Sequence, residues 1–144
     1  MRIYFDTSAV VKLFVLEEGT DATIKVVSGP GELYLLSLAR AEFHSAVQRR
    51  FRDGDLSATE RTELLETFDN QINQEFIIQP TTDGVVSRAL YLLERYPLRA
   101  YDALQLAGCL SLAKPKEIIF ACADDRLLAA AGGEGLQTFN PLNP

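Results

Sequence analysis

The sequence has few of the residues that build disulfide frameworks or zinc sites. In 144 residues it contains two cysteines, one histidine and no tryptophan. Cys109 and Cys122 have no CxxC neighbour, and His44 has no second histidine to pair with at zinc-ligand spacing. We therefore expect both cysteines to be buried free thiols rather than members of a disulfide or a zinc site.

Long apolar runs and an excess of basic residues are also absent. No apolar stretch approaches the ~18 residues that a membrane span needs, and no signal-peptide region follows Met1. We therefore expect a cytoplasmic protein that does not contact a membrane. The net charge of −6 and the pI near 4.8 argue against a protein that coats nucleic acid with a broad basic face. The length fits one domain over 1–144.

The order of sequence patterns predicts an α/β fold. Short apolar runs rich in β-formers predict strands at 3–5, 33–36, 76–78, 118–122 and 137–139. Helical patterns between them cover 8–17, 21–27, 38–51, 58–73, 84–95, 100–112 and 126–131. Because helices separate successive strands, the pattern favours crossover connections and a parallel sheet covered on both faces. Ser57 and Glu60 have the spacing of a capping box at the start of the fourth predicted helix.

Four carboxylates stand out against this framework. Asp6 and Asp124 each follow a predicted strand directly, and Glu42 lies about one turn into the helix after the second strand. Asp102 lies in an otherwise apolar helical segment. The carboxyl ends of parallel strands share one edge of the sheet, so residues far apart in sequence can meet there in one site.

Each aspartate also has a purely structural explanation. Asp6 and Asp124 are well placed to cap the helices that follow them, and Asp102 lies in the first turn of its helix. Glu42 lies inside a helix, where it cannot act as a cap. Because a buried anion must be solvated, paired or bound to a metal, the apolar neighbours of Glu42 and Asp102 favour a shared site.

Carboxylates gathered in one place predict a hard divalent cation. Like charges within a few ångströms raise one another's pKa values unless a cation holds them ionised. All-oxygen ligation without cysteine or histidine selects Mg²⁺ or Mn²⁺ over zinc. Such ions keep several waters, one of which can become a nucleophile, and a phosphodiester is the natural electrophile for this chemistry.

The segments that carry these acids resemble the PIN-domain proteins, and in particular the VapC-type toxins of toxin–antitoxin systems. The segments are DTSAVVK at 6–12, LARAEF at 38–43, LRAYDALQLA at 98–107, and ADDRL at 123–127 before Asn140-Pro141. They occur in the family's order, at suitable spacing, over nearly the whole chain. One such motif is weak, but the four together are specific.

The resemblance implies a three-layer α/β/α domain with a central, mostly parallel sheet of about five strands. It also implies a Mg²⁺- or Mn²⁺-dependent endoribonuclease that hydrolyses RNA phosphodiester bonds with a metal-activated water. Members of this type usually form homodimers and are held inactive by a cognate VapB-like antitoxin. These properties are expectations for the present chain.

The resemblance also assigns roles to individual residues. Asp6, Glu42, Asp102 and Asp124 match the family's acidic positions and are the candidate catalytic and metal-binding residues. Ser8 matches a small polar residue that orients a carboxylate or water. Gln105 stands where many relatives carry histidine, and we expect this difference to affect only a peripheral contact. Asp125 is an additional neighbouring acid, and RNA contacts are expected from Arg126 or from the arginines of 49–52.

Two other functions remain open on the sequence alone. One is a PIN-like module that has lost catalysis and only binds a partner or RNA. The other is an aspartyl-phosphate phosphotransfer domain, because Asp6 also ends a first strand. Hydrolases of that kind usually carry a second aspartate two positions later, where this chain has Ser8.

Overall fold

A five-stranded sheet forms the centre of the computed structural model, which describes residues 1–144. The strands are β1 (Arg2–Phe5), β2 (Glu32–Leu36), β3 (Phe76–Gln79), β4 (Ile119–Ala121) and β5 (Gln137–Phe139). Their order across the sheet is β3-β2-β1-β4-β5, and every neighbouring pair is parallel. The predicted α/β class and strand number are confirmed, and the sheet is parallel throughout.

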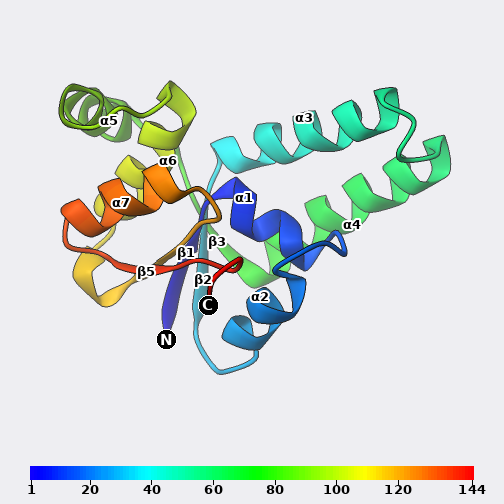
Figure 1. Ribbon diagram of the computed structural model, residues 1–144, viewed down its shortest axis with the longest axis horizontal. Helices are drawn as coiled ribbons and strands as arrows, with labels where there is room; N and C mark the ends of the chain where they lie inside the picture. The colour runs from blue at the N-terminus through cyan, green and yellow to red at the C-terminus, as the bar shows by residue number, and fades with distance from the viewer.

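Helices cover both faces of the sheet and complete the expected three layers (Figure 1). One face carries α1 (Thr7–Val10), the 3₁₀ turn η1 (Val11–Leu13), α2 (Thr20–Val27), α3 (Leu38–Arg52) and α4 (Ala58–Glu75). The other face carries α5 (Asp83–Arg95), α6 (Ala100–Leu110) and α7 (Asp125–Gly133), and a second 3₁₀ turn, η2 (Pro115–Glu117), precedes β4. No helix combines the length and the apolar character that crossing a membrane would require.

Alternation along the strands divides the core between the two faces. In β1, Ile3 and Phe5 pack with α1, α3 and α4, whereas Tyr4 packs with α5, α6 and α7. Successive strand side chains point to opposite faces, so a run that is apolar at every position buries both. On the first face Phe43 of α3 stacks on Phe68 of α4, with ring centroids 3.6 Å apart. This contact joins α3 to α4 within the core on that face.

Side-chain caps set the starts of several helices. Ser57 accepts a hydrogen bond from the Glu60 amide, and the Glu60 carboxylate accepts one from the Ser57 amide. The predicted capping box is therefore confirmed. Thr82 caps α5 by accepting from the Val85 amide. Each cap satisfies amide groups that have no partner within the helix.

The predicted helix over 8–17 is wrong in its second half. The helical segment ends with η1 at Leu13, and the chain then turns back toward α2. Lys12 is buried and donates hydrogen bonds to the Glu17 carboxylate and the Glu18 carbonyl, and Thr20 donates to the Val15 carbonyl. These bonds fold residues 14–18 around the Lys12 ammonium group. Such tertiary contacts override a local helical pattern.

The topology places a crevice between β1 and β4. From β1 the chain adds β2 and β3 on one side, then crosses back to add β4 and β5 on the other. The crossover connections leave in opposite directions at this point, so the carboxyl ends of β1 and β4 flank an open space. Asp6 follows β1 directly, and its amide donates a hydrogen bond to the Ala121 carbonyl at the end of β4.

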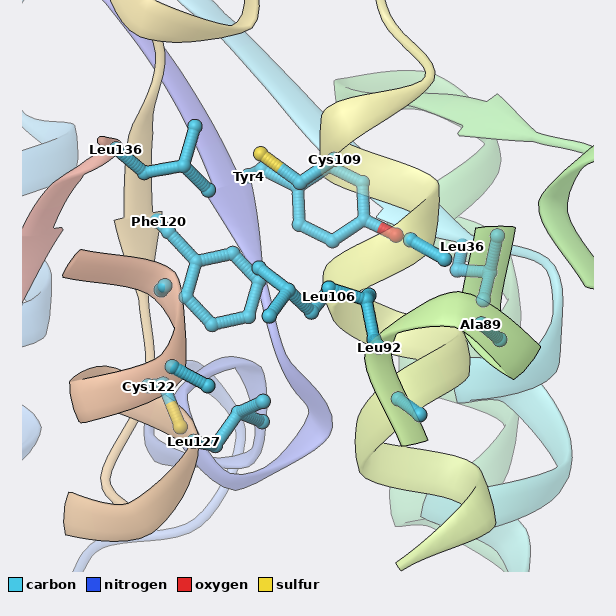
Figure 2. Close-up of a cluster of buried hydrophobic side chains, with 14 of the residues drawn as sticks. Tyr4, Leu36, Ala89, Leu92, Leu106, Cys109, Phe120, Cys122, Leu127 and Leu136 are labelled. Atoms are coloured by element: carbon cyan, nitrogen blue, oxygen red, sulfur yellow. The ribbon is translucent and has the colours of Figure 1, made fainter. Parts of the chain in front are cut away.

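One close contact in the core requires glycine on α6. Tyr4 and Phe120 stack with centroids 5.8 Å apart on the α5–α7 side of the sheet, and Figure 2 shows both rings beside α6 and its Leu106. The Tyr4 hydroxyl is buried without a hydrogen-bond partner. A Cβ atom on Gly108 would lie 2.2 Å from that hydroxyl and 3.0 Å from Leu36 Cδ1. Hence α6 approaches the sheet this closely only with glycine there.

Gly108→Ala is expected to lower the free energy of unfolding by about 1–3 kcal/mol, because the added methyl overpacks the core. Tyr4→Phe should be neutral or stabilising, since it removes a hydroxyl without a partner. The double variant should therefore recover part of the loss in chemical denaturation experiments. If the double variant is no more stable than Gly108→Ala alone, the tyrosine hydroxyl is not the obstacle.

Candidate active site

A cavity of about 650 Å³ opens at the carboxyl edge of the sheet and brings the four predicted acids together. Its walls come from the end of β1 with α1, from α3, from the start of α6 and from the β4–α7 loop. The starts of α1 and α3 lie side by side at this edge (Figure 1). The acidic residues that line it are Asp6, Glu42, Asp102 and Asp124.

Asp6 is the most buried of the four, with 5% of its surface exposed. Its Oδ2 atom accepts hydrogen bonds from the Ser8 amide at 3.1 Å and the Ser8 hydroxyl at 2.5 Å. The Cys122 thiol donates a weaker bond to the same oxygen at 3.6 Å. Asp6 therefore caps α1, as its position predicts, and also lines the cavity.

Ser8 joins the ends of two strands. Its hydroxyl donates to Asp6 Oδ2 and accepts from the Ala123 amide at 3.0 Å, directly after β4. The Cys122 sulfur accepts from the Asp124 amide at 3.2 Å, so the turn into α7 is tied to the same group of atoms. Cys109 and Cys122 are both buried and free, as predicted.

Glu42 is held by two neutral donors from distant segments. Its Oε1 atom accepts from Thr7 Oγ1 at 3.0 Å and from Gln105 Nε2 at 2.7 Å. Gln105 also donates to Thr7 at 3.1 Å. The expectation that position 105 makes only a peripheral contact is wrong, because Gln105 is fully buried and binds a site carboxylate directly. A glutamine in an apolar helical run is the only sequence signal of this role.

Asp102 and Arg99 form an ion pair across the first turn of α6. Arg99 Nε donates to Asp102 Oδ2 at 3.1 Å. The arginine side chain is 82% exposed and the aspartate side chain only 17%. Such an exposed pair contributes little to stability. It does place a guanidinium group at the rim of the cavity, a feature for which the sequence gives no signal.

Asp124 and Asp125 have different surroundings although they are neighbours. Asp124 Oδ1 accepts from the Leu127 amide and caps α7, while the residue also lines the cavity. Asp125 is exposed, lies outside the cavity and accepts a hydrogen bond from Asn140 Nδ2 at 3.3 Å. Asp125 is thus a suitable control position for substitutions of Asp124.

All four cavity carboxylates share one arrangement. In each, one oxygen accepts hydrogen bonds from the protein, and the other oxygen accepts none. The oxygens without a protein partner are Asp6 Oδ1, Glu42 Oε2, Asp102 Oδ1 and Asp124 Oδ2. Each side chain is therefore held through one oxygen, and its other oxygen is free to accept a further interaction.

The acids influence one another although they are not clustered tightly. Burial, with a smaller contribution from the charges of Glu42 and Asp102, raises the pKa of Asp6 to about 6 against the opposing effect of the Ser8 hydrogen bonds. No three acidic, histidine or cysteine side chains in the structure lie close enough to hold one metal ion between them. A cation here would thus be held by fewer direct protein ligands, with water completing its shell, as Mg²⁺ commonly is.

The donor set fits a hard divalent cation on physical grounds. The side-chain atoms in the cavity that could bind a cation are all oxygens, from carboxylates and hydroxyl groups, and the single histidine lies elsewhere, paired with Asp69 on α4 at 2.9 Å. The raised pKa of Asp6 shows that ionising this group is costly without a counter-charge. A bound cation would supply that charge.

The arginines of 49–52 do not act as one cluster. Arg49 lines the cavity and makes no hydrogen bond or ion pair through its side chain. Arg50 instead pairs with Glu17 at 2.8 Å, and Arg52 lies outside the cavity. Arg126 lines a smaller neighbouring cavity of about 280 Å³, which shares Arg99 with the first.

The chain belongs to the PIN-domain family, whose model matches residues 3–132. The fold, the acidic cavity and this match agree with the resemblance seen in the sequence. The chain is similar to Ribonuclease VapC45 of Mycobacterium tuberculosis strain CDC 1551 / Oshkosh. The two are 28% identical over 133 residues, which cover 92% of this chain and 91% of that protein.

Solved structures share the fold over almost the whole chain. FitAcB from Neisseria gonorrhoeae superposes with a TM-score of 0.71 at 20% identity and covers 99% of both chains. A toxin–antitoxin complex from Klebsiella pneumoniae superposes with a TM-score of 0.66 at 16% identity, covering 96% of this chain and 97% of that one. At these identities the likeness concerns the fold.

Asp6→Asn is expected to stabilise the metal-free protein at neutral pH but not at pH 4. The pKa of Asp6 rises from 3.8 to about 6 on folding, so the folded state binds the proton more tightly than the unfolded state. Stability therefore falls as pH rises between these values, by at most about 3 kcal/mol. Asparagine can still accept the Ser8 bonds through its oxygen while carrying no charge.

Thermal unfolding in EDTA at pH 4 and pH 7.5 measures this effect, with Asp125→Asn as the exposed control. The melting temperature of Asp6→Asn should exceed that of the wild type only at pH 7.5. An equal difference at both pH values would contradict the raised pKa.

Proposed function

We propose that this chain is a Mg²⁺- or Mn²⁺-dependent endoribonuclease of the VapC toxin class. The observation that carries the proposal is the set of four carboxylates around one cavity, each with one oxygen fixed and one free. The 28% identical relative named as a ribonuclease supports RNA as the substrate class. Under this proposal the protein and the phosphodiester substrate both present oxygen atoms to the cation.

Under this proposal Asp6, Glu42 and Asp102 surround one cation, with at most two of them as direct ligands and water between the cation and the rest, and Asp124 contributes to a second position. A divalent cation at such a site lowers the pKa of a coordinated water and stabilises negative charge on phosphodiester oxygens. The chain itself has to keep the carboxylates ionised and correctly oriented. It must also leave room for a phosphate group, for which the cavity of about 650 Å³ is large enough.

Neutral hydrogen-bond donors orient the acids. Ser8 holds Asp6, while Thr7 and Gln105 hold Glu42. Hydrogen bonds to an ionised carboxylate favour the charged form without adding a competing positive charge. The carboxylates therefore keep their affinity for a cation. Arg99 is the exception, since its positive charge faces Asp102 from the exposed rim.

The alternative of an inactive PIN-like binding module predicts RNA or partner binding without cleavage. The presence of all four acids, each supported by the protein, argues for catalysis. The aspartyl-phosphate alternative has less support, because Asp6 Oδ2 is occupied by hydrogen bonds from Ser8, the residue that replaces the second aspartate of such enzymes.

Asp124→Asn is expected to lower the rate of RNA cleavage by 100-fold or more in Mg²⁺ or Mn²⁺, since it removes one site charge. Asparagine caps helices about as well as aspartate, so the melting temperature should change little. Asp125→Asn, at the exposed neighbouring position, should retain the wild-type rate.

Cleavage of a broad RNA panel, with and without EDTA, measures both rates. Wild-type protein that binds RNA but cleaves nothing with either metal would support the inactive module. Equal rates for the two variants would place the activity outside this cavity, and trapping of phosphate on Asp6 would revive the phosphotransfer alternative.

We further propose that the chain pairs with a VapB-like antitoxin and forms a homodimer. The similar structure from Klebsiella pneumoniae is a toxin–antitoxin complex, which supports the first part. For the second, Val86, Leu90 and Leu93 form an exposed apolar stripe along α5, with Leu90 59% exposed. The spacing of four and then three residues puts all three on one helix face. A second copy is the occupant we propose for it.

Expression of the wild-type chain alone should arrest growth of a bacterial host, whereas Asp102→Asn should not. Co-expression with the product of a small open reading frame immediately upstream should restore growth. Light scattering of the purified complex should then show two copies of this chain. Normal growth despite active nuclease would contradict the toxin role, and a complex with one copy would contradict the dimer.

A further inference from the structure

One of the four acids in the cavity is held differently from the other three. Asp6, Glu42 and Asp124 accept their hydrogen bonds from neutral groups, either backbone amides or uncharged side chains. Asp102 alone accepts from a charged group, the Arg99 guanidinium, whose Nε atom lies 3.1 Å from Asp102 Oδ2. No other protein group donates to this carboxylate. Its orientation therefore depends on a single ionic partner.

The Arg99 side chain is free to leave this pair. It is mostly exposed, whereas the Asp102 side chain is largely covered. Arg99 forms no other ion pair and donates no other hydrogen bond through its side chain. Its backbone forms the start of α6, where no side chain caps the helix. Because an exposed pair of this kind contributes little to stability, a competing ligand can displace the guanidinium group at small cost.

The same guanidinium group supplies positive charge to several of the acids that a cation would bind. Arg99 lines both the main cavity and the smaller neighbouring one. The hydrogen bond to Asp102 raises the pKa of Arg99, and the charges of Asp102, Asp124 and Asp6 raise it as well. Arg99 thus interacts with three of the four cavity acids. In the metal-free protein it provides part of the positive charge that a bound cation would provide.

A divalent cation and the guanidinium group cannot both keep their full attraction to Asp102. Two positive groups on one carboxylate repel each other, and this repulsion falls only as the inverse of their separation. A cation that uses the free Oδ1 atom therefore weakens the pair at Oδ2. Since coupling between two bound groups is reciprocal, the pair weakens cation binding by the same factor. The neutral donors at the other three acids have no such effect.

We infer that Arg99 is an internal competitor of the divalent cation: its guanidinium group pairs with Asp102 in the metal-free protein and is released when the cation binds. The inference rests on the proposed metal-dependent function and adds a residue that sets the cation concentration at which the site fills. Arg99 acts through Asp102 and is not itself a ligand. Removal of its charge should therefore tighten cation binding, whereas removal of a ligand would weaken it.

Isothermal titration calorimetry with Mn²⁺, in the absence of RNA, measures this competition. At low salt Arg99→Gln should bind the ion about 3- to 10-fold more tightly than the wild type, because it removes an exposed like charge. Arg99→Lys keeps the charge and should stay within about twofold of the wild type. The matched control is Arg52→Gln, at an exposed arginine of α3 outside the cavity, which removes the same charge and should also stay within about twofold.

Two further measurements separate competition at Asp102 from a general effect of charge. The gain in affinity from Arg99→Gln should shrink in the Asp102→Asn background, where the guanidinium group has lost its partner. In NMR spectra of the wild type, the Arg99 Nε–H signal is assigned by its absence from Arg99→Gln. On addition of Mg²⁺ this signal should move toward its position in metal-free Asp102→Asn, in which Arg99 is unpaired. Melting temperatures in EDTA verify that each variant is folded.

Several results would overturn the inference. One is equal affinity of the wild type and Arg99→Gln, and another is a gain no larger than that of Arg52→Gln. An undiminished gain in the Asp102→Asn background, or an Arg99 signal that does not move in saturating Mg²⁺, would do the same. In all these cases the wild type still binds the cation, so the proposed function stands. If the wild type binds neither Mg²⁺ nor Mn²⁺, the proposed metal dependence fails and the inference fails with it.

Discussion

The Ser8 hydroxyl group is the point on which the geometry of the site depends. It donates to Asp6 at the end of β1 and accepts from the Ala123 amide just past β4. The two strands are neighbours in the sheet but more than a hundred residues apart in the chain. The position of Asp6, the turn that carries Asp124 and the start of α7 are all fixed relative to this one oxygen. A parallel sheet provides the shared edge, and Ser8 sets the distances across it.

Structural and functional roles coincide at this edge. Asp6 and Asp124 cap helices through one oxygen, which is the structural role that their positions predict. The same side chains line the cavity, and the other oxygen of each accepts no hydrogen bond from the protein. Each of these residues can therefore cap a helix and bind a ligand at the same time, because a carboxylate has two acceptor atoms. Glu42 follows the same rule with side-chain donors in place of helix amides.

Local patterns in the sequence predicted most of the fold. Four of the five strands are mostly apolar runs of the kind that a doubly covered parallel sheet requires, whereas the edge strand β5 is mostly polar, and the capping box of Ser57 marks the start of α4 correctly. The helix over 8–17 failed because Lys12 gathers carbonyl and carboxylate oxygens from the following turn. That contact depends on where the turn lies in space. The spacing of apolar residues within the segment therefore does not predict this contact.

The acids of the site and Ser8 were identified in the sequence, but the other residues that support the acids were not recognised as doing so. The strand ends placed Asp6 and Asp124, and apolar surroundings singled out Asp102 and Glu42. The direct contact of Gln105 with a site acid was not predicted, because its partner Glu42 is 63 residues away, on a helix that covers the other face of the sheet. Arg49 and Arg50 are adjacent in sequence, yet one faces the cavity and the other pairs with Glu17. The two side chains point in different directions around α3, and the way α3 packs in the fold determines which of them faces the cavity.

The carboxylates with one hydrogen-bonded oxygen and one free oxygen affect how tightly the site can bind a ligand. A free carboxylate side chain loses rotational freedom when it takes up a ligand, and that entropy loss weakens binding. Here the loss occurs during folding for Asp6, Glu42 and Asp124, one oxygen of each being fixed by Ser8, by Thr7 and Gln105, and by an amide of α7. The second oxygen is already oriented before any ligand arrives. The folding free energy of the domain therefore carries the cost of ordering its site.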